Sequence, residues 1–128
     1  MELKTLEKKL WKIFSRYIRQ RDTHSDGLCR CCSCGRLVAP NACDAGHYIS
    51  RRFKSVMFNE KNVHSQCKGC NNWGRTDPEV HRRYGEFIDK KYGAGTADTL
   101  KILAKLPASK DRKSDYRMLI EHYSKEIE

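Results

Sequence analysis

The chain has no long apolar run, so we expect no membrane-spanning helix, which needs about 20 mostly apolar residues. Its first residues, MELKTLEKKLWKIF, also lack the apolar stretch of a signal peptide, and we therefore expect a protein that is not secreted. Hydrophobic residues make up only 38% of the sequence, so the core is thin and a bound metal would help to hold it. With 128 residues and no internal repeat or low-complexity linker, the chain predicts a single small domain.

Negative charge is also scarce relative to positive charge. The chain holds 26 Lys and Arg against 16 Asp and Glu, a formal net charge of +10. An excess of this size indicates a polyanionic partner such as nucleic acid, although a well-solvated basic surface explains it equally well.

Cysteine, in contrast, is plentiful, with seven residues. Two pairs have Cys-x-x-Cys spacing, Cys31 with Cys34 and Cys67 with Cys70, and two such pairs are typical of a tetrahedral zinc site. Disulfide bonds are the alternative, but the paired spacing and the lack of an export signal favour a metal.

The first pair is ambiguous, because Cys29 and Cys32 have the same spacing. Gly35 favours the Cys31 pair, since the turn after the second cysteine of a knuckle needs a residue that tolerates positive φ. Cys29, Cys32 and Cys43 are then packed or free thiols. On the cysteines alone, a purely structural zinc ribbon remains the simpler interpretation.

Helical periodicity brackets this cysteine-rich segment. Apolar residues recur at spacings of three and four over about residues 2–22, which predicts an amphipathic helix. A second helix follows Thr76 or Asp77 as its cap, with Pro78 at the first helical position and Gly93 at the end.

Two more helices are expected, one over about residues 97–105 with Thr96 as its cap, and one from about Asp111 to the C-terminus. Residues 28–75 lack strong helical periodicity and predict loops, a β-hairpin and the start of a helix. We therefore predict an α+β fold in three parts: an N-terminal helix (1–24), a zinc-binding core (25–95) and C-terminal helices (96–128).

The segment between the cysteine pairs holds candidate catalytic residues. The sequence DAGHYI, with Asp44 and His47, predicts one strand of a hairpin, and NVHSQ, which begins at Asn62, predicts the return strand. The second cysteine pair then leads into a helix that begins near Asn71. This order resembles the HNH nucleases, whose centre is a treble-clef ββα-metal arrangement, here with asparagine at the last motif position. The resemblance implies that His47 is the general base and that Asn62 ties the loop down through backbone hydrogen bonds.

A closer resemblance covers roughly residues 15–85. The blocks that carry it are YIRQRD (17–22), C-x-S-C-G (31–35), DAGHY (44–48) and FNE-x-NVH-x-QC-x-x-CN (58–71). They are similar to the NinG/Rap family, the recombination endonucleases of lambdoid phages. The resemblance implies a structure-selective DNA endonuclease that cuts branched intermediates such as D-loops and Holliday junctions. It also implies a phage or prophage protein in the cytoplasm of a bacterial host.

The residue types predict a hydrolytic mechanism. Neutral His47 can take a proton from water and direct the hydroxide at phosphorus. Oxygen ligands such as Asp44 and Asn71 favour Mg²⁺ or Mn²⁺, which would offset charge on the phosphate. Many HNH sites place the acidic ligand immediately before the base, and that position is Gly46 here. A β-bulge at this glycine would bring Asp44 closer.

Further residues are candidates for contacts with DNA. His64 either donates to a phosphate in the site or packs on the zinc knuckle. Trp73 either stacks on an exposed base or, as we expect, packs against the knuckle. The basic residues predicted to contact phosphates are Arg51, Arg52, Lys54, Arg75 and Arg82.

Two other functions are compatible with the sequence. One is a non-catalytic, zinc-dependent module that binds nucleic acid, and the other is a sequence-specific HNH nuclease of the homing or restriction type. Symmetric cutting of a junction would favour a homodimer, with the N-terminal helix as its surface.

Overall fold

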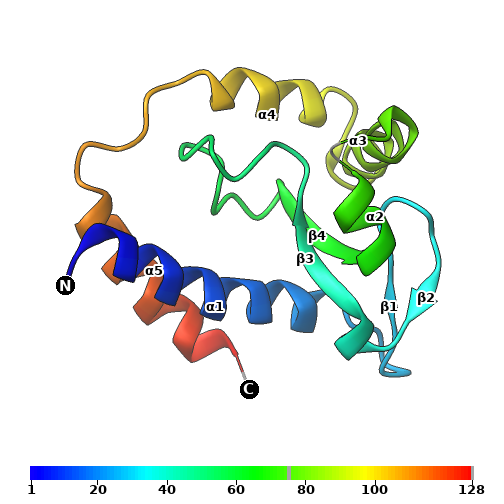
Figure 1. Cartoon of the computed structure of the whole chain (residues 1–128), viewed down its shortest axis with the longest axis horizontal. Coiled ribbons are helices and arrows are strands. Elements are labelled where there is room, and N and C mark those ends of the chain that lie inside the picture. The colour runs from blue at the N-terminus through cyan, green and yellow to red at the C-terminus, as the bar shows by residue number, and fades with distance from the viewer. Residues whose placement is uncertain (75, 128) are drawn as a thin grey trace.

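The computed structural model describes residues 1–74 and 76–127, which form a small mixed α+β domain (Figure 1). In chain order the elements are α1 (Leu3–Arg21), β1 (Cys29–Arg30), β2 (Leu37–Val38), the 3-10 turn η1 (Pro40–Ala42), β3 (Cys43–His47), β4 (Val63–Cys67), α2 (Lys68–Trp73), α3 (Pro78–Tyr92), α4 (Thr96–Ala104) and α5 (Arg112–Glu126). Helices α1 and α5 lie side by side at the lower left of Figure 1, next to the β3–β4 hairpin, and α3 and α4 lie at the top and upper right. Across the described ranges, no helix is both long and apolar enough to cross a membrane.

Helix α1 begins and ends within one residue of its predicted bounds. Its buried residues, spaced by four, are Leu6, Leu10, Phe14 and Ile18. Phe14 meets Tyr123 of α5 edge-on at 5.0 Å between ring centroids, and Ala45 and Val63 of the hairpin join the same cluster. The apolar stripe of α1 is therefore covered by α5 and the hairpin of the same chain.

The central hairpin positions the candidate site. Its antiparallel strands pair five residues each without interruption, from Cys43 opposite Cys67 to His47 opposite Val63. The bulge expected at Gly46 is therefore wrong, because Gly46 keeps its place in the ladder. A β-bulge needs one extra residue on one strand, and the two strands here have equal numbers of residues.

An unbroken register makes successive side chains alternate between the two sides of the hairpin. We call the side with Asp44, Gly46, His64 and Gln66 the polar face, and the side with Ala45, His47 and Val63 the apolar face. The apolar face packs on α1, and the polar face is covered by α2 and α3.

Two tight turns carry the paired cysteines. After β1, Gly35 has a φ of 76° and its N–H donates to Cys31 O at 2.9 Å, as the turn chemistry predicted. At the end of β4, Cys67 caps α2, which begins at Lys68 rather than near Asn71. Asn71 thus lies inside a helix of six residues that rests against the hairpin.

The C-terminal helices begin and end close to the predicted residues. Asp77 caps α3, Pro78 is its first residue, and Gly93 ends it with a φ of 118°. The predicted cap of α4 is wrong. Gly95, with a φ of 91°, holds the N-cap position, while the Thr96 hydroxyl donates backwards to Gly93 O at 2.7 Å.

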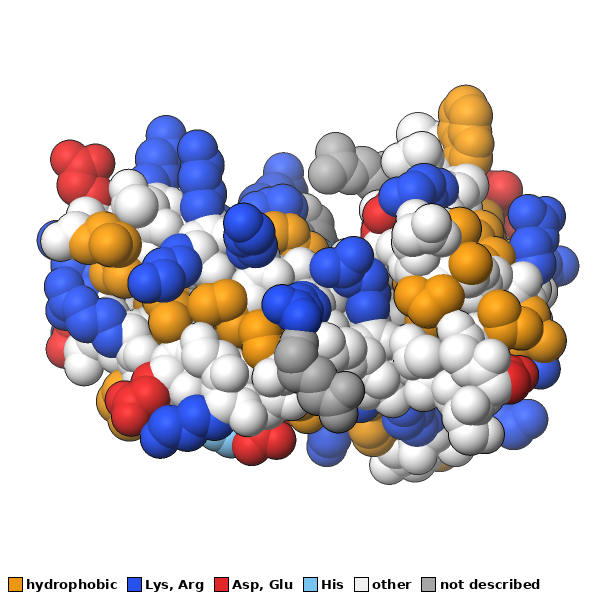
Figure 2. All heavy atoms as spheres, turned by 90° about the horizontal axis from the view of Figure 1, so that it is seen from below, with side chains coloured by type: hydrophobic (Ala, Val, Ile, Leu, Met, Phe, Trp, Pro, Cys, Tyr) orange, Lys and Arg blue, Asp and Glu red, His pale blue; other side chains and the backbone are white. Residues whose placement is uncertain are grey.

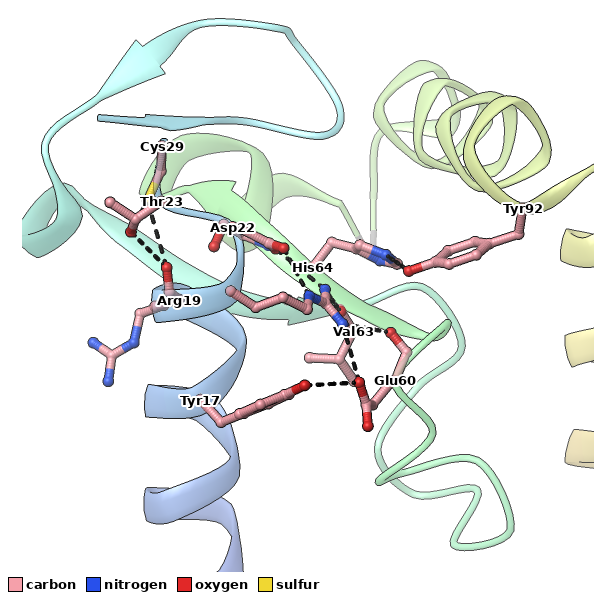
Figure 3. A network of polar contacts seen from close by, with 12 residues as sticks. Tyr17, Arg19, Asp22, Thr23, Cys29, Glu60, Val63, His64 and Tyr92 are labelled. Carbon is pink, nitrogen blue, oxygen red and sulfur yellow. Dashed lines mark hydrogen bonds and ion pairs between the residues drawn. The ribbon is translucent and has the colours of Figure 1, made fainter. Parts of the chain in front are cut away.

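A polar network holds the end of α1 on β4 (Figure 3). The Arg21 guanidinium donates to Val63 O at 2.8 Å and to Glu60 O at 3.1 Å. The Asp22 carboxylate accepts from the Ser65 N–H at 2.8 Å. Each of these contacts satisfies a buried or half-buried polar group. The end of the YIRQRD block therefore has a structural role, because it fixes α1 to the hairpin.

Candidate functional site

Four cysteines converge where the two turns meet. The sulfur atoms of Cys31, Cys34, Cys67 and Cys70 all lie within 4.8 Å of one another. The N–H of Cys34 points at Cys31 Sγ (3.5 Å) and that of Cys70 at Cys67 Sγ (3.4 Å). Burial alone would raise the pKa of Cys31, but hydrogen bonds from backbone N–H groups, beginning with that of Cys34, lower it on balance. The four cysteines are thus positioned to bind one metal ion and are compatible with structural zinc.

The other three cysteines lie outside this cluster, as Gly35 indicated. Cys29 is fully buried beside the Thr23 hydroxyl, with Sγ and Oγ1 3.2 Å apart. Cys43 Sγ donates to Pro40 O at 3.3 Å, and Cys32 is buried in the cluster of α3 and α4. The four cysteines that the turn glycine selected are therefore the four that the structure brings together.

Asp44 and Asn71 come into direct contact on the polar face. Asn71 Nδ2 donates to Asp44 Oδ2 at 3.1 Å, and Lys68 Nζ pairs with Asp44 Oδ1 at 2.8 Å. The Lys68 side chain is 58% exposed, so this ion pair is open to water and is easily exchanged. A strand residue and a helix residue thus meet on the polar face, and the oxygen of the same Asn71 amide is directed at Gly46.

His47 lies at the end of β3 on the apolar face, and its ring is held from two sides. Nε2 lies 2.9 Å from Met57 O, and the ring stacks on Trp11 of α1 at 4.8 Å between centroids. Burial, together with the positive charges of Arg51 and Lys54, lowers the pKa of His47 to about 4. The imidazole is therefore neutral at pH 7.

Sequence reasoning missed Trp11. It lies on α1, 36 positions before His47, and was not distinguishable from the apolar stripe of that helix. The Arg51 guanidinium lies over its indole, 5.4 Å from the ring centroid, so Trp11 links the predicted base to a predicted DNA contact.

Asn62 has the anchoring role that the resemblance implied. Its side chain is fully buried. Oδ1 accepts from the Ile49 N–H at 2.8 Å, while Nδ2 donates to Ile49 O at 3.1 Å and to Val56 O at 3.0 Å. These three bonds close the loop that carries the basic residues, and this prediction is confirmed.

His64 lies in the interior. It is 0% exposed, and its ring nitrogens lie 3.3 Å from Tyr84 Oη and 2.8 Å from Tyr92 Oη. Burial, followed by the charge of Arg21, lowers the pKa of His64 to about 3. Of the two interpretations left open, packing is the one observed, although against α3 rather than on the zinc knuckle. The buried ring does not reach a phosphate at the surface.

The predicted DNA contacts differ in availability. Arg51 and Arg52 are exposed on the loop after the base, and Figure 2 shows Lys and Arg spread over one face with Asp and Glu at fewer positions. Lys54 is instead half-buried and ion-paired with Glu7 at 2.9 Å. Arg82 pairs with Glu79 and Glu86 on α3. Arg75 lies outside the described residues.

The expected burial of Trp73 is wrong, because its side chain is 65% exposed at the end of α2. None of the six residues of α2, all of which are described, is buried. A helix this short touches the hairpin along one side only, which leaves Trp73 in solvent.

Comparisons with known proteins support the NinG part of the closer resemblance. The family described as "Bacteriophage Lambda NinG protein" matches residues 1–128. The chain is similar to "Protein ninG" of Escherichia phage lambda, with 41% identity over 56 residues, or 43% of this chain and 25% of that protein. No solved structure matches the chain. Since the family match extends over the whole chain, the protein belongs to the bacteriophage lambda NinG family.

Proposed function

We propose that this protein is a metal-dependent DNA endonuclease with an HNH-like, treble-clef ββα-metal centre, and that branched DNA is its substrate. The observation that carries the proposal is the contact of Asp44 with Asn71. It joins a strand to a helix: Asp44 lies three residues before His47 on β3, and Asn71 directly follows Cys70 of the four-cysteine site.

The donor set fits a hard divalent ion. A carboxylate from Asp44 and the amide oxygen of Asn71 are oxygen donors of the kind that Mg²⁺ and Mn²⁺ prefer. Asn71 Nδ2 donates to Asp44, and Asn71 Oδ1 is directed towards Gly46. Such an ion, when bound, would neutralise charge on the scissile phosphate and on the leaving oxygen.

His47 has the protonation state that a general base needs. A hydrogen bond to the Met57 carbonyl requires that Nε2 carry the proton, which leaves the Nδ1 lone pair to accept one from water. The stacked indole of Trp11 restricts the ring to one plane. Water deprotonated at Nδ1 attacks phosphorus, and the products are a 5′-phosphate and a 3′-hydroxyl.

Exposed groups around this centre suit nucleic acid. Arg51 and Arg52 are exposed on the loop, four and five residues after His47, where they would hold phosphates. Trp73, two residues after Asn71, offers an exposed indole on which an unpaired base at a branch point can stack. Branched DNA supplies such bases and linear duplex does not.

The test is a cleavage panel of linear, forked, D-loop and four-way substrates with Mg²⁺ or Mn²⁺. We expect branched substrates to be cut, and His47→Ala to lower the rate at least about a hundredfold while zinc content is unchanged. His24→Ala is the matched control, because His24 is exposed in the loop after α1. Wild-type rates in His47→Ala would remove His47 from the mechanism.

The second candidate function is a non-catalytic, zinc-dependent nucleic-acid-binding module. It is favoured because the proposed catalytic residues already have partners: Lys68 pairs with Asp44, and Trp11 covers one face of His47. Binding of junction DNA with no cleavage under either metal would support this alternative. Preferential cutting of one linear sequence would instead support a homing- or restriction-type nuclease.

A further inference from the structure

Gly46 leaves a small space on the polar face that a side chain from the opposite strand fills. A Cβ atom at Gly46 would lie 1.8 Å from Gln66 Oε1 and 3.0 Å from Asn71 Oδ1. Two amide oxygens, from β4 and from α2, therefore converge on the point where any other residue at position 46 would place its side chain.

The carboxamide of Gln66 is held in this orientation. Its side chain is buried (3% exposed), and Nε2 donates to the Ser33 hydroxyl at 2.9 Å. Ser33, also buried, lies between the two cysteines of the first knuckle. With the nitrogen fixed on the zinc knuckle, the oxygen is directed at Gly46. Gln66 also stands opposite Asp44 in the ladder, so the three oxygen-bearing side chains share one side of the hairpin.

We propose that Gln66 Oε1 is a ligand of the divalent ion, together with Asn71 Oδ1 and Asp44. This oxygen occupies the position that a side chain on residue 46 would otherwise take. This inference rests on the proposed function for the site itself. A neutral carbonyl oxygen is a hard donor suited to Mg²⁺ and Mn²⁺. One carboxylate and two amides give a weakly charged site, so the ion binds poorly until a phosphate adds its charge.

Direct Mn²⁺ binding tests the assignment without DNA. Electron paramagnetic resonance of the zinc-loaded full chain reports free and bound Mn²⁺. Gln66→Met keeps the length of the side chain and removes the oxygen, and we expect its Mn²⁺ affinity to fall at least about tenfold. Gln66→Glu adds a charge and should bind Mn²⁺ more tightly than the wild type. Gln20→Met, an exposed change on α1, is the control. Unchanged Mn²⁺ affinity in a folded, zinc-loaded Gln66→Met would overturn the proposal.

A compensating pair keeps the test decisive if Gln66→Met folds poorly. Gly46→Asp alone should lower the melting temperature, because its Cβ meets Gln66 Oε1. Gly46→Asp combined with Gln66→Ala removes that contact and supplies an oxygen from the other strand. We expect the double variant to bind Mn²⁺ more tightly than Gln66→Ala. Equal or weaker binding would contradict a shared ligand position.

Cleavage of branched DNA, measured on the same variants, separates the two proposals. If Gln66→Met loses Mn²⁺ binding but the wild-type protein cuts no substrate, Gln66 is a metal ligand and the proposal of a nuclease is wrong. If the wild-type protein cuts branched DNA but Gln66→Met binds Mn²⁺ normally, the protein is a nuclease and the proposal that Gln66 is a ligand is wrong.

Discussion

The two faces of the β3–β4 hairpin are built differently. The apolar face is filled by Ala45 and Val63 against the stripe of α1, and aromatic rings from α5 complete the cluster. The polar face buries Gln66 and His64 and holds Asp44 half-buried, each with a hydrogen-bonding partner. One face thus contributes stability through burial, while the other holds oxygen and nitrogen atoms in place. His47 belongs to the apolar face, so the proposed base and the proposed metal ligands come from opposite sides of one strand.

The largest expected effect comes from removing the metal that the four cysteines at the end of the hairpin are positioned to bind. Cys67 ends β4 and caps α2, and structural zinc contributes on the order of 10 kcal/mol of apparent binding energy. We expect Cys67→Ser to lose zinc and to unfold the hairpin region, measured by zinc content and circular dichroism.

The three cysteines outside the four-cysteine cluster provide the controls for that experiment. Cys29→Ser, Cys32→Ser and Cys43→Ser should keep the zinc, because these sulfur atoms lie outside the four-cysteine cluster. Zinc loss in Cys32→Ser together with zinc retention in Cys34→Ser would show that the ligand set is wrong.

Brief chelation should also remove a divalent ion on oxygen ligands while leaving zinc and fold intact.

A cavity in the apolar face should lower stability without touching the metal sites. Phe14 is fully buried between Phe58 and Tyr123, and Phe14→Ala should cost about 3–5 kcal/mol in free energy of unfolding, measured with urea. Ile102→Ala, at an exposed site on α4, should cost much less. Similar losses for both variants would mean that the apolar face is not the main source of stability.

Acid should destabilise the protein through His47. Its pKa is about 4 in the folded chain against 6.5 in the unfolded chain, so the unfolded state binds more protons between these values. This contribution is complete above pH 6.5 and is lost as pH falls towards 4. From pH 7 to pH 5 it amounts to about 2 kcal/mol. His47→Gln should lose correspondingly less stability than the wild type over that interval. Equal pH dependence in both proteins would contradict the burial of a neutral imidazole.

The smallest effect should come from the exposed loop that belongs to neither face. Arg51 and Arg52 release counterions when they hold phosphates, so replacing both with Ala should lower the salt slope of junction binding by up to about 2. Affinity for a four-way junction between about 50 and 200 mM salt measures this slope. Lys54→Ala should change it less, because Lys54 is ion-paired with Glu7. If replacing both arginines leaves the salt slope unchanged, the DNA does not contact this loop.

Local chemistry let the sequence determine much of this protein. The spacing of apolar residues set the bounds of α1, and the need for positive φ at Gly35 selected Cys31 and Cys34 as ligands. The motif position of Asn62 indicated its bonds to the loop. The first two depend on residues close in the chain, where turn geometry and helical period act directly, whereas the role of Asn62 was implied by the family resemblance.

Tertiary structure decided the rest. The stacking of Trp11 on His47, the burial of His64 by two tyrosines of α3, and the meeting of Gln66 with Asn71 over Gly46 depend on how separate elements pack. Trp73 is exposed because α2 ends before anything covers it. A strand pattern fixes which residues share a face, but only the packed helices determine what that face meets.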